Sequence, residues 1–142
     1  MAVTAANVAQ GTGALPRDYS AGGTVTVGNA VYVDSNAAVQ AAKADTAATS
    51  AAIGIAVAVV KPGQTTAASG DKVTVVTLGP VGGFSSLTPG AVYYVDASTA
   101  GAITATAPTG ALVWAKSIGY AESATVLFVL PGIRPAISSA GA

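Results

Sequence analysis

The chain has 142 residues, of which six are Lys or Arg, six are Asp or Glu and none is Cys or His, so its formal net charge is zero. The missing residue types exclude disulfide bonds, thiolate zinc sites, cysteine nucleophiles and histidine general bases. Charged residues make up 8% of the chain, where about 25% is usual, and hydrophobic residues make up 51%. The few positive charges are scattered, so we expect no binding to nucleic acid or to an anionic membrane surface.

The scarcity of charge is informative in itself. A soluble monomer usually carries far more charge, and a net charge near zero favours association. The longest apolar runs, Ile53–Val60 and Val126–Leu130, are far shorter than the roughly 20 residues that span a bilayer. Met1–Gln10 lacks the positive start and apolar stretch of a secretory signal. Because charge is so scarce, we expect much of the surface to be covered by neighbouring subunits.

In chain order, the sequence predicts an arm, a β domain and a tail. Residues 1–22 are rich in Ala, Gly and Asn and are predicted to form an extended N-terminal arm, not a packed element. Residues 133–142 are predicted to be a short loose tail. In the domain, residues 23–132, Gly and Pro recur at roughly 8–12-residue intervals, which is typical of short antiparallel strands. The predicted strands are Thr24–Val27, Ala30–Asp34, Ala38–Ala42, Ile53–Val60, Lys72–Leu78, Val92–Asp96, Ala102–Thr106, Val113–Glu122 and Thr125–Leu130.

Turns and one short helix are expected between these strands. Gly and Pro pairs favour turns, because glycine adopts positive φ and proline fixes its own φ. The predicted turns are Gly28–Asn29, Pro62–Gly63, Gly70–Asp71, Gly79–Pro80 and Pro89–Gly90. The segment 36–52 is rich in Ala, the best helix former, so a short helix is expected within residues 43–52.

The chain contains an internal repeat. The sequence VTVGNAVYVDS from Val25 matches LTPGAVYYVDA from Leu87, and IGIA at residues 53–56 matches IGYA at residues 118–121. The pattern predicts strand–turn–strand–loop–strand, used twice, in an antiparallel barrel or sandwich. The Gly of each IG-x-A motif permits a close strand approach or a bulge. We expect the Asp after each Tyr-Val pair to end its strand in a side-chain-to-backbone turn.

Catalytic motifs are weak. Ser69–Lys72 matches the S-x-x-K pattern of a nucleophile and its base, but it lacks the companion motifs and is interpreted as a hairpin turn. The segment 63–72 lacks the spacing and the hydroxyl residue of a phosphate loop. The acidic residues are spread singly, without an EF-hand pattern or a carboxylate pair. We therefore predict no enzyme, no cofactor and no metal site.

Four residues are candidates for binding a partner. Arg17, Asp18 and Tyr19 place two charges and an aromatic ring together in the arm, as a docking cluster or a local turn. Trp114 is either a core residue or an anchor at a subunit interface, where Trp is enriched.

Three segments resemble the capsid decoration (cement) proteins of tailed bacteriophages, a pattern also found in modules of tail fibres. They are Gly83–Pro108, Ile118–Pro131 and Ile53–Val81, and the resemblance extends over about residues 24–132. It implies an all-β, barrel-like or tulip-like domain, often a homotrimer, on the outer surface of the capsid. Terminal arms in this family commonly reach onto neighbouring capsomers, and there are no catalytic residues to carry over.

The expected function is therefore that of a structural virion protein, made in the host cytoplasm, whose partner is the major capsid protein. By bridging capsomers it would stabilise the phage head. The alternative is a head- or tail-fibre component with a receptor-binding role. A third possibility, a carbohydrate-binding β module, would use Tyr93, Tyr94 and Trp114.

Overall fold

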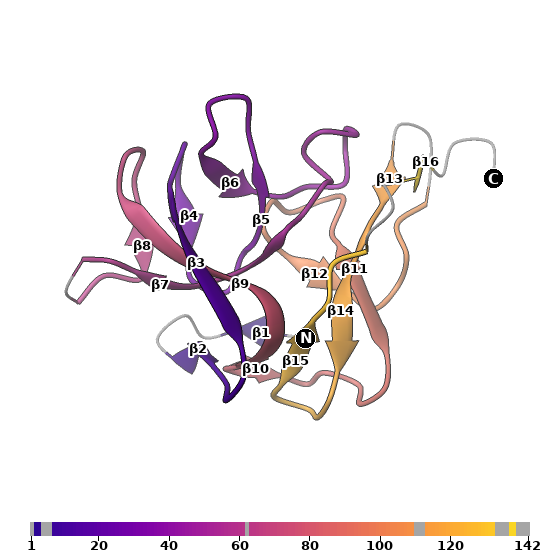
Figure 1. The fold of residues 1–142 in the computed structure, drawn as a ribbon. Helices are drawn as coiled ribbons and strands as arrows, with labels where there is room; N and C mark the ends of the chain where they lie inside the picture. The colour runs from indigo at the N-terminus through magenta and orange to yellow at the C-terminus, as the bar shows by residue number, and fades with distance from the viewer. Residues whose placement is uncertain (1, 4–6, 62, 110–112, 133–136, 139–142) are drawn as a thin grey trace.

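The computed structural model in Figure 1 is an all-β, antiparallel half-barrel, which confirms the predicted fold class. The structure describes residues 2–3, 7–61, 63–109, 113–132 and 137–138. Its strands are β1 (Ala2–Val3), β2 (Ala9–Gln10), β3 (Leu15–Ser20), β4 (Val25–Thr26), β5 (Ala30–Val33), β6 (Val39–Ala41), β7 (Gly54–Val59), β8 (Thr66–Ala67), β9 (Lys72–Gly82), β10 (Phe84–Ser85), β11 (Val92–Val95), β12 (Ile103–Thr104), β13 (Trp114–Ala115), β14 (Ser117–Ala121), β15 (Leu127–Val129) and β16 (Ile137–Ser138).

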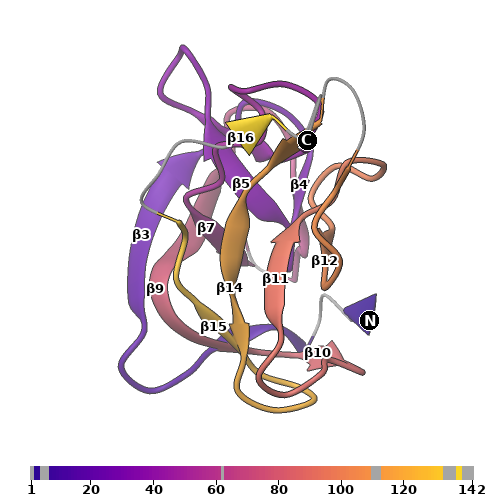
Figure 2. The same ribbon diagram turned by 90° about the vertical axis from the view of Figure 1, so that its right-hand side faces the viewer.

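One long strand joins the two halves of the main sheet. The strand order is β12-β11-β14-β15-β9-β7-β5-β6. In this order β9 lies between β15 of the second half and β7 of the first half. The first part of β9 pairs with β7 and its last part pairs with β15. The opposite edge of β9 is covered by β3 and β2, which follow one another along it. The sheet curls around β9, as the two views in Figures 1 and 2 show.

A glycine inside β9 allows this strand to change partners. Gly79 has a φ of 115°, a conformation that side chains rarely adopt. A Cβ at this position would also lie 2.7 Å from the Cα of Ala14. The predicted turn at Gly79–Pro80 is therefore wrong: both residues lie within β9, where the carbonyl of Pro80 accepts a hydrogen bond from Gly11 N–H at 2.7 Å.

The internal repeat is visible in the strand registers. The triplets β6-β5-β7 and β12-β11-β14 have the same order and the same antiparallel directions. Val31 faces Gly54 in the first triplet, and Tyr93 faces Gly119 at the equivalent position in the second. A Cβ added to either glycine would collide with a carbonyl oxygen of the neighbouring strand. The predicted close approach at both IG-x-A motifs is thus confirmed.

Hydrogen bonds at the hairpin turns repeat as well. Gly28 N–H donates to Ala56 O at 2.7 Å, and Gly90 N–H donates to Ala121 O at 2.8 Å. Both glycines have positive φ. Each turn therefore ties the start of a repeat to the final residue of its own IG-x-A motif.

The two predicted Asp turns are confirmed. Asp34 Oδ1 accepts the N–H of Asn36 at 2.8 Å, and Asp96 Oδ1 accepts the N–H of Ser98 at 2.6 Å. Gln40 Nε2 also donates to Asp34 Oδ2 at 2.6 Å. These side-chain bonds satisfy backbone N–H groups just beyond the end of each strand, where the hydrogen bonds of the sheet stop.

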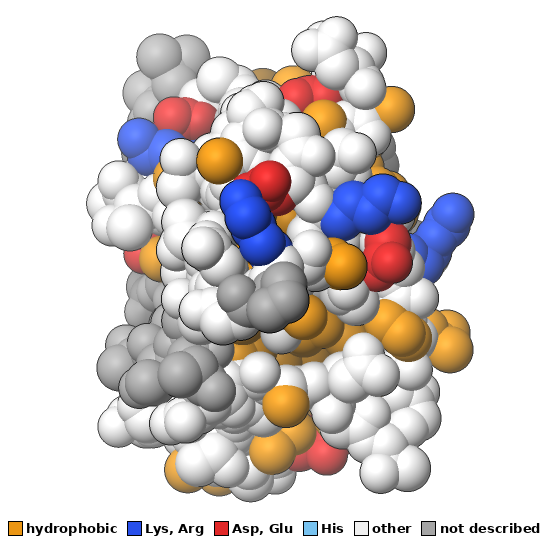
Figure 3. Space-filling model, turned by 90° about the vertical axis from the view of Figure 1, so that its left-hand side faces the viewer, with side chains coloured by type: hydrophobic (Ala, Val, Ile, Leu, Met, Phe, Trp, Pro, Cys, Tyr) orange, Lys and Arg blue, Asp and Glu red, His pale blue; other side chains and the backbone are white. Residues whose placement is uncertain are grey.

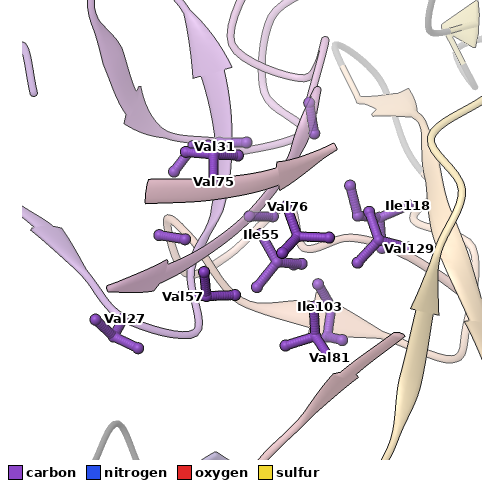
Figure 4. Close-up of a cluster of buried hydrophobic side chains, with 14 of the residues drawn as sticks. Val27, Val31, Ile55, Val57, Val75, Val76, Val81, Ile103, Ile118 and Val129 are labelled. Atoms are coloured by element: carbon purple, nitrogen blue, oxygen red, sulfur yellow. The ribbon is translucent and has the colours of Figure 1, made fainter. Parts of the chain in front are cut away.

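The core is built mainly from Val and Ala. Figure 4 shows side chains from both halves meeting around β9, and Tyr93 and Phe84 are the aromatic members of the buried core. The labelled members are Val27, Val31, Ile55, Val57, Val75, Val76, Val81, Ile103, Ile118 and Val129. Close packing of such small side chains requires close strands, which the two buried glycines provide.

Two segments differ from the sequence-based expectation. The predicted helix within residues 43–52 is wrong, because this segment forms turns. The Thr49 hydroxyl lies within hydrogen-bond distance of two acceptors, Lys43 O at 2.9 Å and Asp45 Oδ1 at 2.8 Å, and bonding of this kind competes with the helical pattern. Residues 15–20 of the predicted arm are extended, but they pair with β9 as strand β3. The expectation that the arm contains no packed element is therefore wrong for these residues.

Parts of three predictions lie outside the described residues: 1 and 4–6 of the arm, Pro62 of one turn, and 133–136 and 139–142 of the predicted tail. Ile137–Ser138 of the tail pairs with Trp114–Ala115 as β16 with β13.

Replacing Gly119 or Gly54 by Ala is expected to lower the free energy of unfolding by about 2–3 kcal/mol, because the new methyl group meets a neighbouring backbone carbonyl. Gly82→Ala is the matched control, since its Cβ would lie 3.9 Å from the nearest atom, Ala9 O. Urea unfolding followed by circular dichroism measures the difference. Equal midpoints for the Gly119 and Gly82 variants would contradict the close approach.

Asp34 is expected to make stability depend on pH in acid. The hydrogen bond from Gln40, then those from the Ala38 and Asn36 N–H groups, hold the pKa of Asp34 below its ordinary 3.8. An ionised Asp34 with a lowered folded-state pKa stabilises the fold at pH values above the ordinary pKa. This stabilisation is lost as the pH falls through the lowered pKa of the folded state. Asp34→Asn should therefore lower the melting temperature near pH 7 and reduce its further fall toward pH 2. An equal loss at both ends of the range would refute this role.

Candidate interaction surface

Three of the predicted partner-binding residues lie on β3. Arg17 is exposed and its guanidinium lies 5.9 Å from the ring centre of Tyr19, which is half-buried against the core. Asp18 accepts a hydrogen bond from the Thr74 hydroxyl on β9 at 2.8 Å. The cluster is therefore part of a strand and not a local turn.

The fourth predicted residue, Trp114, lies elsewhere. It is half-buried at the start of β13, and its N–H donates to Ala44 O at 3.1 Å. Figure 1 places β13 in a different part of the molecule from β3, and Figure 2 shows its partner β16 away from β3 as well. The four predicted residues thus do not form one site.

The outer edge of β3 is open. Both backbone groups of Ala21 bond toward β9, to Asp71 and Gly70, and Gly22 N–H turns the other way, to Val39. By the alternation of a strand, the N–H and C=O groups of Asp18 point away from β9. An isolated parallel bridge between Ala21 and Val39 occupies this edge at its end beside Ser20. No described strand pairs with the edge at Asp18, which lies at the margin of the molecule in Figure 2. An edge of this kind accepts an added strand.

An apolar row crosses the outside of the second half of the sheet. Val92 faces Tyr120, Tyr120 faces Phe128, and Phe128 faces Pro80, across β11, β14, β15 and β9. The neighbours of these residues along each strand are buried, so the row points outward. Val92 is 44% and Tyr120 is 38% exposed. The rings of Tyr120 and Phe128 stack with centres 5.4 Å apart.

A second row, of leucines, adjoins the first. Leu15 on β3 faces Leu78 on β9, and they are 54% and 37% exposed. Leu130, 50% exposed, follows Val129, whose partner on β9 is Gly79, so the register places Leu130 beside Leu78. We call the two rows together the outer apolar face. It consists of Leu15, Leu78, Pro80, Val92, Tyr120, Phe128 and Leu130.

Sequence reasoning did not single out this face. Apolar residues in a strand were expected to be core, and the runs in β11 and β15 are apolar at every position. A strand that is apolar on both faces is typical of one that is buried on both faces. Residues 127–130 carry this pattern, because the buried side chains and the outward side chains there are all apolar.

A separate apolar groove of about 580 Å³ lies beside β7. Valines line it at positions 8, 27, 57, 59 and 60, together with Lys61 and the 63–65 loop. Figure 3 shows this side of the molecule, with hydrophobic side chains gathered across its middle and charged side chains above them. Lys61 lies 3.8 Å from the Asp71 carboxylate.

The titratable groups form no reactive cluster within the described part of the chain. No three carboxylates there lie close enough to hold a metal ion. Burial lowers the pKa of Lys116, whose ammonium donates to Gly132 O. The S-x-x-K motif lies on a turn, as expected, where Asp71 Oδ2 accepts Ala68 N–H at 2.9 Å and Gly70 has positive φ.

No family model and no curated protein matches this chain. Within the ranges that the structure covers, no helix is long and apolar enough to cross a membrane.

Removing residues 2–20 is expected to lower the melting temperature and to cause concentration-dependent aggregation, because it uncovers the edge of β9. The control is the double substitution Arg17→Ala and Asp18→Ala, which keeps the strand and should change stability by only about 0.5 kcal/mol. Thermal melts and dynamic light scattering compare the two proteins. A truncated chain that melts like the full chain and stays dispersed would show that β3 does not protect β9.

Proposed function

We propose that the chain is a structural virion protein that decorates the outside of a tailed-bacteriophage head. In this role it binds the major capsid protein as a homotrimer and stabilises the shell by bridging capsomers. The resemblance of residues 24–132 to capsid cement proteins is the starting point. The observation that carries the proposal is the outer apolar face, which the single chain leaves uncovered although the chain has almost no charge to keep it dispersed.

The open edge of β3 is the proposed contact with the shell. Its side chains are mostly exposed, and the backbone groups of Asp18 point outward. An extended segment of a capsid protein can add to such an edge through main-chain hydrogen bonds, without any charge match. This mode of binding suits a chain with net charge zero.

Stabilisation then follows from mass action. A protein that binds only the assembled shell stabilises it by about 2.7 kcal/mol per site when its concentration is a hundred times its Kd. A trimer that engages several capsomers at once gains further from avidity. Such a role needs no reactive group on the protein.

The first test is whether the protein is part of the particle. Phage particles purified on a density gradient are expected to contain the chain in a fixed ratio to the major shell protein. Immunogold labelling should place it over the head. Absence from particles would overturn the proposal, and a few copies confined to fibres would favour the receptor-binding alternative.

The β3 contact is tested with a proline. Asp18→Pro removes an outward N–H and blocks strand addition, while the bonds to β9 come from the alternate residues. It is expected to weaken binding to undecorated heads at least about tenfold. Asp18→Asn, which keeps the N–H, is the matched control and should bind like the wild type. Equal binding by both variants would exclude β3 as the shell contact.

A further inference from the structure

The outer apolar face is large enough to be the centre of an interface. Five of its seven residues are between 37% and 54% exposed, and large apolar patches on monomers are often functional. A stable interface covers about 800 Å² on each partner, with an apolar centre and a polar rim. None of the seven residues is charged, so the centre of the face can be dehydrated without burying an ion.

Opposite charges stand at the two ends of the face. Glu122 is exposed two residues beyond Tyr120, at the end of β14. Arg17 is exposed two residues beyond Leu15, on β3 at the other side of the sheet. Neither forms an ion pair with another described residue. Copies of the chain arranged around a three-fold axis would place the Glu122 end of each face beside the Arg17 end of the next.

We infer that the outer apolar face packs against a second copy of this chain, with Glu122 of one copy beside Arg17 of the next. In the proposed homotrimer, each neighbouring copy supplies an uncharged face of equal size, and the two neighbours supply the complementary charges at the two ends. The stacked rings of Tyr120 and Phe128 are already ordered, so they lose little freedom on association. The inference rests on the proposed assembly role and names the surface that holds the copies together.

Light scattering after size exclusion tests the apolar part of this interface. The wild type is expected at a multiple of the 13.5 kDa chain mass at micromolar concentration. The double variant Val92→Lys and Leu130→Lys, which puts charges on the face, should elute as a monomer. The matched control is Val33→Lys and Val60→Lys, two comparably exposed positions off the face, and it should keep the wild-type mass. A monomeric wild type, or a face variant with unchanged mass, would overturn the inference.

Charge reversal tests the orientation of the copies. Arg17→Glu is expected to raise the association midpoint at least about tenfold, because it faces Glu122 of the next copy. Adding Glu122→Arg to the same chain should restore the wild-type midpoint. Failure of the second change to rescue the first would refute the proposed pairing. Near-ultraviolet circular dichroism verifies that each variant is folded.

Binding to undecorated phage heads, measured separately, distinguishes this inference from the proposed function. If the wild type assembles through the face but does not bind heads, the interface stands and the decoration role fails. If the wild type binds heads as a monomer and the face variant does not, the face contacts the shell. That result would overturn the interface while the decoration role stands.

Discussion

The pairing of β9 on both of its edges is the constraint on which the rest of the fold depends. This one strand contacts β7 and β15 along one edge and β3 and β2 along the other. Val73, Val75, Val76 and Val81 are fully buried along it, each contributing about 1.5–3 kcal/mol. A net backbone hydrogen bond contributes about 1 kcal/mol, so each buried valine contributes at least as much as one bond of the ladder. The small core works because both halves pair with this strand, the first through β7 and the second through β15.

Most strands could be predicted because their cause is local. The repeated Tyr-Val-Asp and IG-x-A motifs place a strand end and a close approach in each half, and both were found at the expected residues. The strand at 15–20 was missed because all its side chains except Tyr19 are exposed, so it has no apolar alternation. It is held mainly by backbone bonds to β9, which a side-chain pattern does not reveal. The Gly79–Pro80 turn was wrong because a glycine with positive φ can also bend a continuous strand.

The candidate surface was harder to predict than the fold. Arg17, Asp18 and Tyr19 do lie together, because they are consecutive on one strand, whereas Trp114 is held on β13 by a partner in a different loop. The outer apolar face depends on registers among β11, β14, β15 and β9, which are far apart in sequence. A period of two reveals that a strand has two faces. It does not reveal which face is the core when both are apolar.

The shared strand β9 also determines how the protein folds and unfolds. In a linear array of repeats each unit contacts only its neighbours, so units can melt separately and can be added or lost. Here the two halves contact each other directly, through the hydrogen bonds from Ala30 N–H to Gly101 O and from Ala44 N–H to Asp96 O. Both halves also depend on β9, the first through β7 and the second through β15, and each of these strands loses a partner if β9 leaves. The two halves therefore unfold in a single cooperative transition, and the duplication cannot be shortened to one copy.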